Sequence, residues 1–490
     1  MTRPDLEGPD HSIRRPCVRS LLSWRPPKLA LREQPVRAVE EPLKPNTYRE
    51  SPLDSSELPP GIPYIVSNEA AERFSFYGMK AILVVFMTTA LLDRTGAPAP
   101  MEEGEARAWY HAFNAAVYFT PLAGALLADV FLGKYRTILS LSLFYCLGHL
   151  CLALDETRLG LLLGLSLIAL GAGGIKPCVS AHVGDQFGER NQHRLPGVFG
   201  AFYFAINLGS FVATLLIPWL LATWGSAVAF GLPGVLMALA TFIFWLGRDR
   251  FVHIPARGMA VWREIVSAEG RDALGRLVGI YLFVAVFWAL YDQTGSSWVL
   301  QGTRMNLHAL GVSWLPSQVQ ALNPVLILLL VPLFTAVLYP WIGRLMPFGA
   351  LRRIGLGFWL TALAFAWSAG LETVIAAGQT PNIAWQLPAW ILITAGEVLV
   401  SVTCLEFSYT QAPRTLKSLV MALFFLSISL GNLLVAAINF LLLDEHGASR
   451  LANREYFWFF ALLMAAAALL FVPVARRFQG RTYLQTSESA

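Results

Sequence analysis

Long apolar segments alternate with short polar breaks along almost the whole chain after Tyr64. A helix needs roughly 20 mostly apolar residues to cross a bilayer, and twelve segments reach that length. Their approximate ranges are 64–92, 108–130, 135–154, 158–179, 197–222, 227–246, 277–299, 319–341, 354–377, 386–410, 416–443 and 457–475. The pattern predicts an all-α membrane protein with twelve transmembrane helices.

Composition agrees with a membrane protein and excludes several other classes. Only 14% of the 490 residues are charged, whereas soluble domains carry about 25%. The net charge of +5 is small and the basic residues fall in short loops, so we expect no nucleic-acid partner. The five cysteines lack the spacing of a metal site, and we predict neither a bound metal nor a disulfide.

Polar stretches divide the chain into five parts. Residues 1–60 are rich in Pro and Arg and show no apolar period, which predicts a disordered tail. The long break at 248–276 separates six spans from six. We therefore expect two six-helix bundles, 61–247 and 277–475, joined by a linker, with a second tail at 476–490. Within the linker, Ala260 to Leu274 has the pattern of a short interfacial helix.

Lys and Arg are distributed unevenly between the two sides of the predicted spans. Eighteen lie on the side that holds both tails and six on the other. By the positive-inside rule, both termini are predicted to be cytoplasmic, in a multi-pass protein of the cell (inner, cytoplasmic) membrane.

The first span carries charges that are costly in a bilayer, at least about 2.5–3.5 kcal/mol each on insertion scales. A helical turn of about 100° per residue places Glu69, Glu72, Arg73 and Tyr77 on one side, facing the interior of a bundle. Glu69 and Arg73 have the spacing of a purely structural ion pair. The second carboxyl group would then be unmatched, and desolvation of an unmatched acid favours its protonated form. Glu72 is therefore the predicted proton carrier, while Lys80 is interpreted as packed or snorkelling.

Other spans contain further isolated polar groups. His111 titrates near neutral pH in its ordinary state, although a single helical histidine is often merely hydrogen-bonded. Lys176 follows three glycines and precedes Pro177, and we expect a loosened helix there that lines a cavity. The remaining groups are Asn207, Asp292, Asn323, Glu397 and Glu406.

This inventory suits a zwitterionic ligand. Arg73 and Lys176 in the first half can bind a carboxylate, and Glu397 with Asn323 in the second half can bind an ammonium group. A ligand held between both halves would bias which side of the protein opens.

Four blocks, in order, resemble the proton-dependent oligopeptide transporter family of the major facilitator superfamily. The blocks are Glu69-x-x-Glu72-Arg73-Phe74-x-x-Tyr77-Gly78, Gly124-x4-Asp129-x3-Gly133-Lys134-Tyr135-Arg136, Gly173-Gly174-Ile175-Lys176-Pro177 with Gly184-Asp185-Gln186-Phe187, and Phe202-Tyr203-x-x-Ile206-Asn207-x-Gly209-Ser210. Residues around His111 and Glu406 resemble the animal branch. The resemblance implies a major facilitator fold.

The resemblance also implies roles for individual residues. Proton coupling is expected at Glu69, Glu72, His111 and Asp292. Substrate binding is expected at Arg73, Tyr77, Tyr118, Lys176, Asn207, Trp288, Asn323 and Glu397. A proton relay from the first-span acids through His111 is one expectation.

Two departures from the family stand out. The break at 248–276 is too short for the two extra helices of many bacterial members, and the loop between spans nine and ten is too short for the extracellular domain of animal members. The chain thus resembles a minimal, bacterial, twelve-helix member. Arg276 matches an animal-branch arginine, but Thr335 replaces its usual acidic partner, so a salt bridge there is not expected.

The leading hypothesis is import of di- and tripeptides by proton symport and alternating access, with protons as the coupling ion and no other cofactor. An alternative is another substrate on the same scaffold: nitrate, an amino acid or a peptide-like drug. The scattered Cys and His residues and the lack of a nucleophile with its base disfavour an enzyme. No obligate protein partner is expected besides the lipid bilayer.

Overall fold

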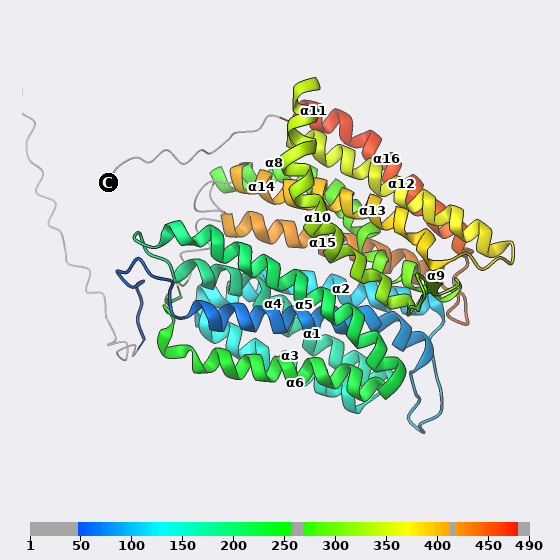
Figure 1. Ribbon diagram of the computed structural model, residues 1–490, viewed down its shortest axis with the longest axis horizontal. Helices are drawn as coiled ribbons and strands as arrows, with labels where there is room; N and C mark the ends of the chain where they lie inside the picture. Colours follow the sequence, from blue (N-terminus) through cyan, green and yellow to red (C-terminus); the bar gives the residue numbers. More distant parts are fainter. Residues whose placement is uncertain (1–47, 257, 259–267, 412–416, 479–490) are drawn as a thin grey trace, which may run out of the picture. The chain divides into compact units, whose positions relative to one another are not determined.

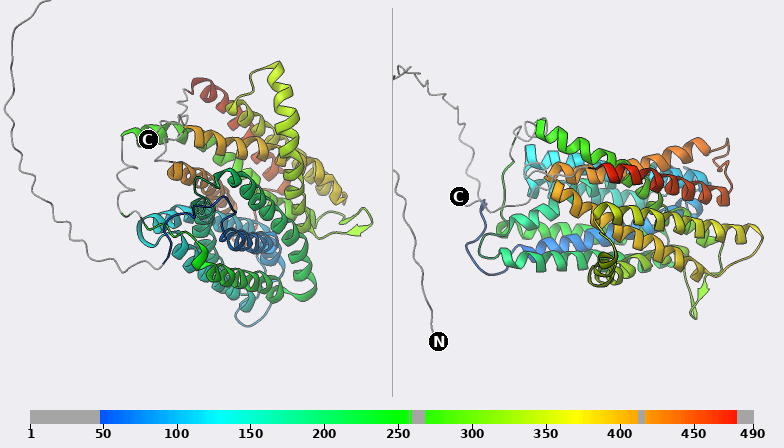
Figure 2. Two further views of the ribbon diagram at one scale, coloured as in Figure 1. Left: turned by 60° about the vertical axis from the view of Figure 1, so that its left-hand side comes forward. Right: turned by 90° about the horizontal axis from the view of Figure 1, so that it is seen from above.

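The computed structural model describes residues 48–256, 258, 268–411 and 417–478, and their main elements are long helices (Figure 1). The first half contains α1 (Ile62–Thr89), α2 (Glu103–Leu126), α3 (Lys134–Leu154), α4 (Arg158–Asp185), α5 (Leu195–Trp224) and α6 (Ser226–Leu246). The second contains α8 (Ala268–Tyr291), α9 (Ser297–Thr303), α10 (Leu322–Leu333), α11 (Tyr339–Leu345), α12 (Ala350–Ala376), α13 (Leu387–Glu397), α14 (Thr403–Gln411), α15 (Lys417–Leu442) and α16 (Asn453–Arg477). The short strands β1 (His308–Ala309) and β2 (Val312–Ser313) form an antiparallel hairpin (Figure 2).

The predicted all-α membrane fold is confirmed. Eleven helical segments among the described residues are long and apolar enough to cross a bilayer. At 28 residues α1 is also long enough, but it carries the four charges noted above. With α1 counted, the spans divide six and six between two bundles, an N-terminal bundle of α1–α6 and a C-terminal bundle of α8–α16.

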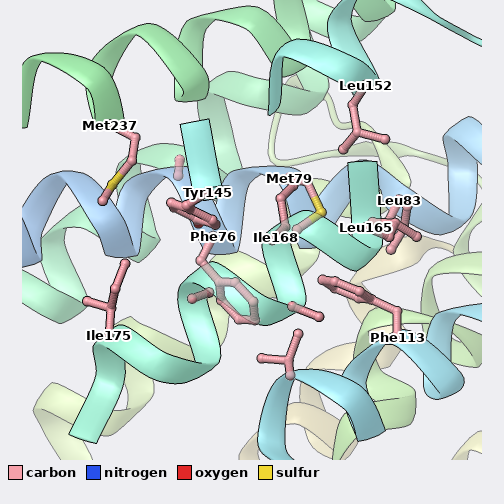
Figure 3. Close-up of a cluster of buried hydrophobic side chains, with 14 of the residues drawn as sticks. Phe76, Met79, Leu83, Phe113, Tyr145, Leu152, Leu165, Ile168, Ile175 and Met237 are labelled. Carbon is pink, nitrogen blue, oxygen red and sulfur yellow. The ribbon is translucent and has the colours of Figure 1, made fainter. Parts of the chain in front are cut away.

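Helices of the N-terminal bundle pack closely through apolar side chains. Here α1 lies against α5 and α6, and α3 lies against α4 and α6. Phe76 and Met79 of α1 lie with Tyr145 of α3 and Ile168 of α4 in the hydrophobic core of this bundle (Figure 3).

Glycines of α4 serve this packing, which corrects one expectation. The segment around Lys176 is not loosened, because α4 is helical through Pro177 to Asp185. A Cβ at Gly173 would overlap the Thr120 side chain, and one at Gly124 of α2 would overlap the backbone of Gly174. The glycines therefore permit a close approach of α2 and α4.

Several spans of the C-terminal bundle are interrupted. A 3₁₀ turn (Asp292–Gly295) separates α8 from α9, so Asp292 stands at a break in its span. A π-helical turn (Val398–Val402) separates α13 from α14 directly after Glu397, and another (Phe334–Leu338) separates α10 from α11. Such turns often mark functional positions, and apolar periodicity gave no signal for them.

The last part of the segment predicted as a disordered tail packs on the N-terminal bundle. It comprises residues 48–57, here named the strap. Arg49 donates to the Arg250 carbonyl at 2.8 Å and accepts from the His253 amide at 2.8 Å. Arg194 and Asn191 donate to the carbonyls of Ser56 and Glu57.

Helix α8 begins at Ala268, inside the predicted linker, and the candidate membrane span within it begins at Leu277, the predicted start. Residues 260–267 of the expected interfacial helix lie outside the described residues, and 268–274 belong to α8. Cys17, residues 1–47 and residues 479–490 of the second tail likewise lie outside them. Among the described residues, Cys146, Cys151, Cys178 and Cys404 are free.

Candidate functional site

The charges of α1 form one buried cluster. Arg73 Nε donates to Glu69 Oε1 at 2.7 Å and lies 3.1 Å from Glu72 Oε2. Glu72 is fully buried, yet neither of its carboxyl oxygens accepts a hydrogen bond from the described residues. The two acids are therefore unequal, since Glu69 shares a directed hydrogen bond with Arg73 and Glu72 does not.

Lys176 of α4 lies beside this cluster. Its Nζ stands 3.7 Å from the centre of the Phe76 ring and 4.8 Å from that of Tyr118. It has no hydrogen-bond partner among the residues described, although Arg73 and Glu72 lie within electrostatic range. A buried cation that lies over aromatic faces and lacks a hydrogen-bond partner is available to an incoming anion.

Tyr77 connects the α1 cluster to the C-terminal bundle. One turn after Arg73, it lies within electrostatic range of Arg73 on its own helix and of Glu397 on α13. Asn207 of α5 is nearly buried, and its amide donates to the Tyr203 carbonyl at 2.9 Å. Most of the residues predicted for substrate binding in the first half thus lie near the α1 cluster.

In the C-terminal bundle, Glu397 and Asn323 form the predicted acid and amide pair. Asn323 Nδ2 donates to Glu397 Oε2 at 2.7 Å and lies 3.3 Å from Thr394 Oγ1. Tyr291 lies beside the same carboxylate, a neighbour that sequence reasoning missed. Glu406 is exposed on α14, so the two acids of this span face different surroundings.

Trp288 of α8 lies near these groups among aromatic rings. Its indole contacts Tyr291 and Phe424, with ring centres 5.2 Å and 6.0 Å apart. The indole Nε1 is buried without a hydrogen-bond partner in the described part of the chain. A donor of this kind is free to bind a polar group of a ligand.

A polar network joins the two bundles. Lys80 Nζ of α1 contacts Asp292 Oδ1 at 2.7 Å, and Asn432 Nδ2 of α15 donates to Asp292 Oδ2 at 2.6 Å. The ring nitrogens of His111 lie 2.8 Å from Asn432 Oδ1 and 2.9 Å from Ser296 Oγ. His111 therefore connects to Asp292 through Asn432.

This network corrects two sequence interpretations. Lys80 is neither snorkelling nor merely packed, because it is the cation of an inter-bundle pair. His111 is not bonded to Glu69 or Glu72, so the expected relay from these acids through His111 is absent from the described contacts. Asn432 and Ser296 were missed, although a lone Asn in an apolar span is a recognisable signal.

Further contacts join the bundles where α1 ends and α2 begins, here named the closed end. Arg304 contacts Glu103 of α2 at 2.7 Å and Glu372 of α12 at 2.8 Å. Buried Arg107 donates to Asn453 at 3.2 Å and stands 4.5 Å from the Tyr456 ring centre. Among the described residues, the hydrogen bonds between the bundles lie between the middle of the spans and this end. These bonds hold the two bundles together at this end.

Comparison with known proteins decides the family. A model described as the POT family matches residues 135–267 and 256–458. The chain belongs to the POT family. Its twelve-span, two-bundle architecture is the major facilitator fold of that family.

Curated relatives include animal proteins. The chain is 36% identical to human "Solute carrier family 15 member 2" over 395 residues, which are 70% of this chain and 53% of the relative. It is 38% identical to "Peptide transporter family 1" of Drosophila melanogaster over 370 residues, 65% of this chain and 49% of the relative. The chain thus spans about half the length of the curated relatives that it matches.

Solved structures agree over a larger share. An "auto inhibited POT family peptide transporter" superposes with a TM-score of 0.80 at 37% identity, covering 88% of this chain and 99% of the other. The "POT family transporter PepTSo" gives 0.79 at 35% identity, covering 86% and 99%. The POT architecture therefore extends over nearly all described residues of this chain.

Proposed function

We propose that this chain imports di- and tripeptides together with protons by alternating access. The observation that carries the proposal is that cations able to bind a carboxylate lie in one bundle, and an acid able to bind an ammonium group lies in the other. Arg73 and Lys176, which has no hydrogen-bond partner in the described part of the chain, lie in the N-terminal bundle, and Glu397 with Asn323 lies in the C-terminal bundle. A peptide zwitterion could satisfy both sets at once.

The same arrangement gives an orientation for the bound peptide. The carboxylate would meet Arg73 and Lys176, and the ammonium group would meet Glu397 and Asn323, with Tyr77, Tyr118, Asn207 and Trp288 between them. Because the two sets stand on different bundles, bound peptide would hold the bundles together around it. Nitrate has no ammonium group for Glu397, which disfavours a bare anion. A single amino acid or a peptide-like drug remains the alternative.

Proton coupling is assigned to Glu69, Glu72, Asp292 and His111. Neutralising Glu72 would leave Arg73 paired with Glu69 alone, and protonating Asp292 would release Lys80 from the inter-bundle pair. Each protonation would change a contact that stabilises one conformation of the carrier. The membrane potential supplies about 2.3 kcal/mol per charge per 100 mV, enough to drive accumulation.

In this proposal the protein lies in a bacterial cytoplasmic membrane with both termini cytoplasmic. The closed end then faces outward. Protons serve as the coupling ion without another cofactor or an obligate protein partner, and transport involves no covalent step. The POT relatives carry transporter names, which fits a carrier that is not an enzyme.

Uptake of a labelled dipeptide into proteoliposomes tests the proposal. An imposed inward proton gradient should drive accumulation, and a protonophore should abolish it. Excess unlabelled di- and tripeptide should compete, whereas nitrate and free amino acids should not. Glu397→Gln should lose uptake while Glu406→Gln, at an exposed position of the same span, retains it. Uptake indifferent to the gradient would refute symport.

A further inference from the structure

A hollow of about 310 Å³ is lined by Met101 and by residues of α2 and α4, none of which belongs to the candidate peptide site. Its lining is apolar except for Arg158 and Ser166. Ala112 and Ala116 stand four residues apart on one face of α2, and Ala169 stands opposite them on α4. These small side chains leave the space open, with Phe113 and Leu165 at its sides.

The surface around the hollow faces membrane hydrocarbon. Both helices belong to candidate membrane spans. Leu159, Leu162, Leu163 and Leu170 of α4 are each about half exposed, and exposed leucines in a span contact lipid. A molecule in the hollow would therefore come from the bilayer.

The length of the hollow matches one leaflet. From Arg158, the first residue of α4, to Ala169 the helix rises about 16 Å at 1.5 Å per residue. Half of a hydrocarbon core about 30 Å thick is about 15 Å. A single acyl chain that begins at the interface would run along the whole hollow.

The interfacial end of the hollow is polar. The Arg158 guanidinium pairs with the Glu105 carboxylate, with Nη2 to Oε2 at 3.0 Å, while about half of the Arg158 side chain stays exposed. A guanidinium has five N–H donors, so donors remain for a phosphate. Trp109, also in the lining, is the residue type favoured at this membrane depth.

We propose that the α2–α4 hollow binds one acyl chain of a membrane phospholipid, whose phosphate contacts Arg158. The site also touches the seam between the bundles, because the Trp109 ring contacts Phe440 of α15 with ring centres 5.5 Å apart. Bound lipid would therefore stabilise the closed end. This site is separate from the charges proposed for peptide transport.

Photolabelling of the full-length protein tests the site. A phosphatidylglycerol with a diazirine in its acyl chain is added to proteoliposomes, and labelled peptides are mapped by mass spectrometry. Labelling should concentrate on 109–116 and 161–169. Ala116→Phe, which fills the hollow from an exposed position, should reduce this labelling at least about fivefold, a difference of about 1 kcal/mol. Ala238→Phe, at an exposed position of α6, should leave it unchanged.

The headgroup contact is tested with a second probe. Arg158→Gln should reduce labelling by the phosphatidylglycerol probe but not by a diacylglycerol that carries the same chain without phosphate. If labelling of the α2–α4 hollow equals the labelling of other membrane-facing helices, the site is overturned. Labelling that is unchanged in Ala116→Phe would also overturn it. An equal loss of both probes in Arg158→Gln would overturn the phosphate contact.

Discussion

Lys80 of α1 and Asp292 at the end of α8 form an ion pair of 2.7 Å that crosses from one bundle to the other. Both side chains are largely buried, and 212 residues separate them in the chain. Removing one partner of a buried pair costs about 3–5 kcal/mol, because the other charge stays buried alone. Lys80→Met or Asp292→Leu alone should therefore lower the thermal unfolding temperature of the purified protein more than the double variant Lys80→Met/Asp292→Leu does. A double variant as unstable as the sum of the singles would contradict a direct interaction between Lys80 and Asp292.

Glu72→Gln should separate coupling from binding. Neither Glu72 oxygen accepts a hydrogen bond from the described residues, so an amide should be tolerated while the titrating group is lost. We expect gradient-driven accumulation to disappear and peptide exchange at equal pH to survive. Glu69→Gln is the matched comparison, since it weakens the 2.7 Å bond to Arg73 and should impair exchange as well. Loss of exchange in Glu72→Gln would make Glu72 a substrate or folding residue.

Lys176→Ala should weaken binding of peptides with a free C-terminal carboxylate by about tenfold or more, equivalent to about 1.4 kcal/mol. The reason is that Lys176 Nζ lies over the Phe76 and Tyr118 rings and has no hydrogen-bond partner among the described residues. Peptides amidated at the C-terminus should be affected much less. Competition assays with matched free and amidated dipeptides measure the difference, and equal losses would refute the assignment.

Arg304→Gln should shift the carrier toward opening of the closed end, because Arg304 contacts Glu103 of one bundle and Glu372 of the other. Spin labels at the exposed positions Arg94 and His446 should show a larger population of long distances in this variant. Arg454→Gln is the control, since Arg454 pairs with its neighbour Glu455 within one helix. Identical distance distributions in both variants would exclude a closing role for Arg304.

Packing of the strap should weaken in acid. His253 stacks on Tyr48 of the strap with ring centres 4.2 Å apart, and burial lowers the pKa of His253 below its ordinary 6.5. Its Nε2 donates to the Arg248 carbonyl, and its charged neighbours are Arg49, Arg136 and Asp249. His182 of α4 also lies nearby. With the strap detached, His253 would bind more protons than when it is buried, so the contact is fully present above pH about 6.5 and is lost as pH falls below it.

Amide hydrogen exchange of residues 48–57 measures this effect, after correction for the intrinsic pH dependence of exchange. Protection should decrease between pH 7 and 5 in the natural sequence and change less in His253→Phe, which keeps an aromatic ring beside Tyr48. Equal pH responses in both proteins would exclude His253 as the titrating group.

Local pattern in the sequence determined the class of this protein. The apolar segments predicted six spans on each side of the central break, and helices such as α3 and α6 begin within one residue of their predicted starts. The shared face of Glu69, Glu72 and Arg73 was also predictable, because helical geometry fixes the relation of residues three and four apart. Glu397 and Asn323 were inferred from their chemistry as joint partners of an ammonium group, and the structure places them within 2.7 Å of each other.

Only the tertiary structure decided the partners of Lys80 and His111. Their contacts with Asp292, Asn432 and Ser296 join residues far apart in the chain, and periodicity carries no information about such distances. Tertiary structure also decided the packing of the strap. Its polar composition predicts a disordered tail, but residues far away in the chain supply its hydrogen bonds. Sequence thus set which helices form and which charges are buried, and the packing of helices on one another set what those charges meet.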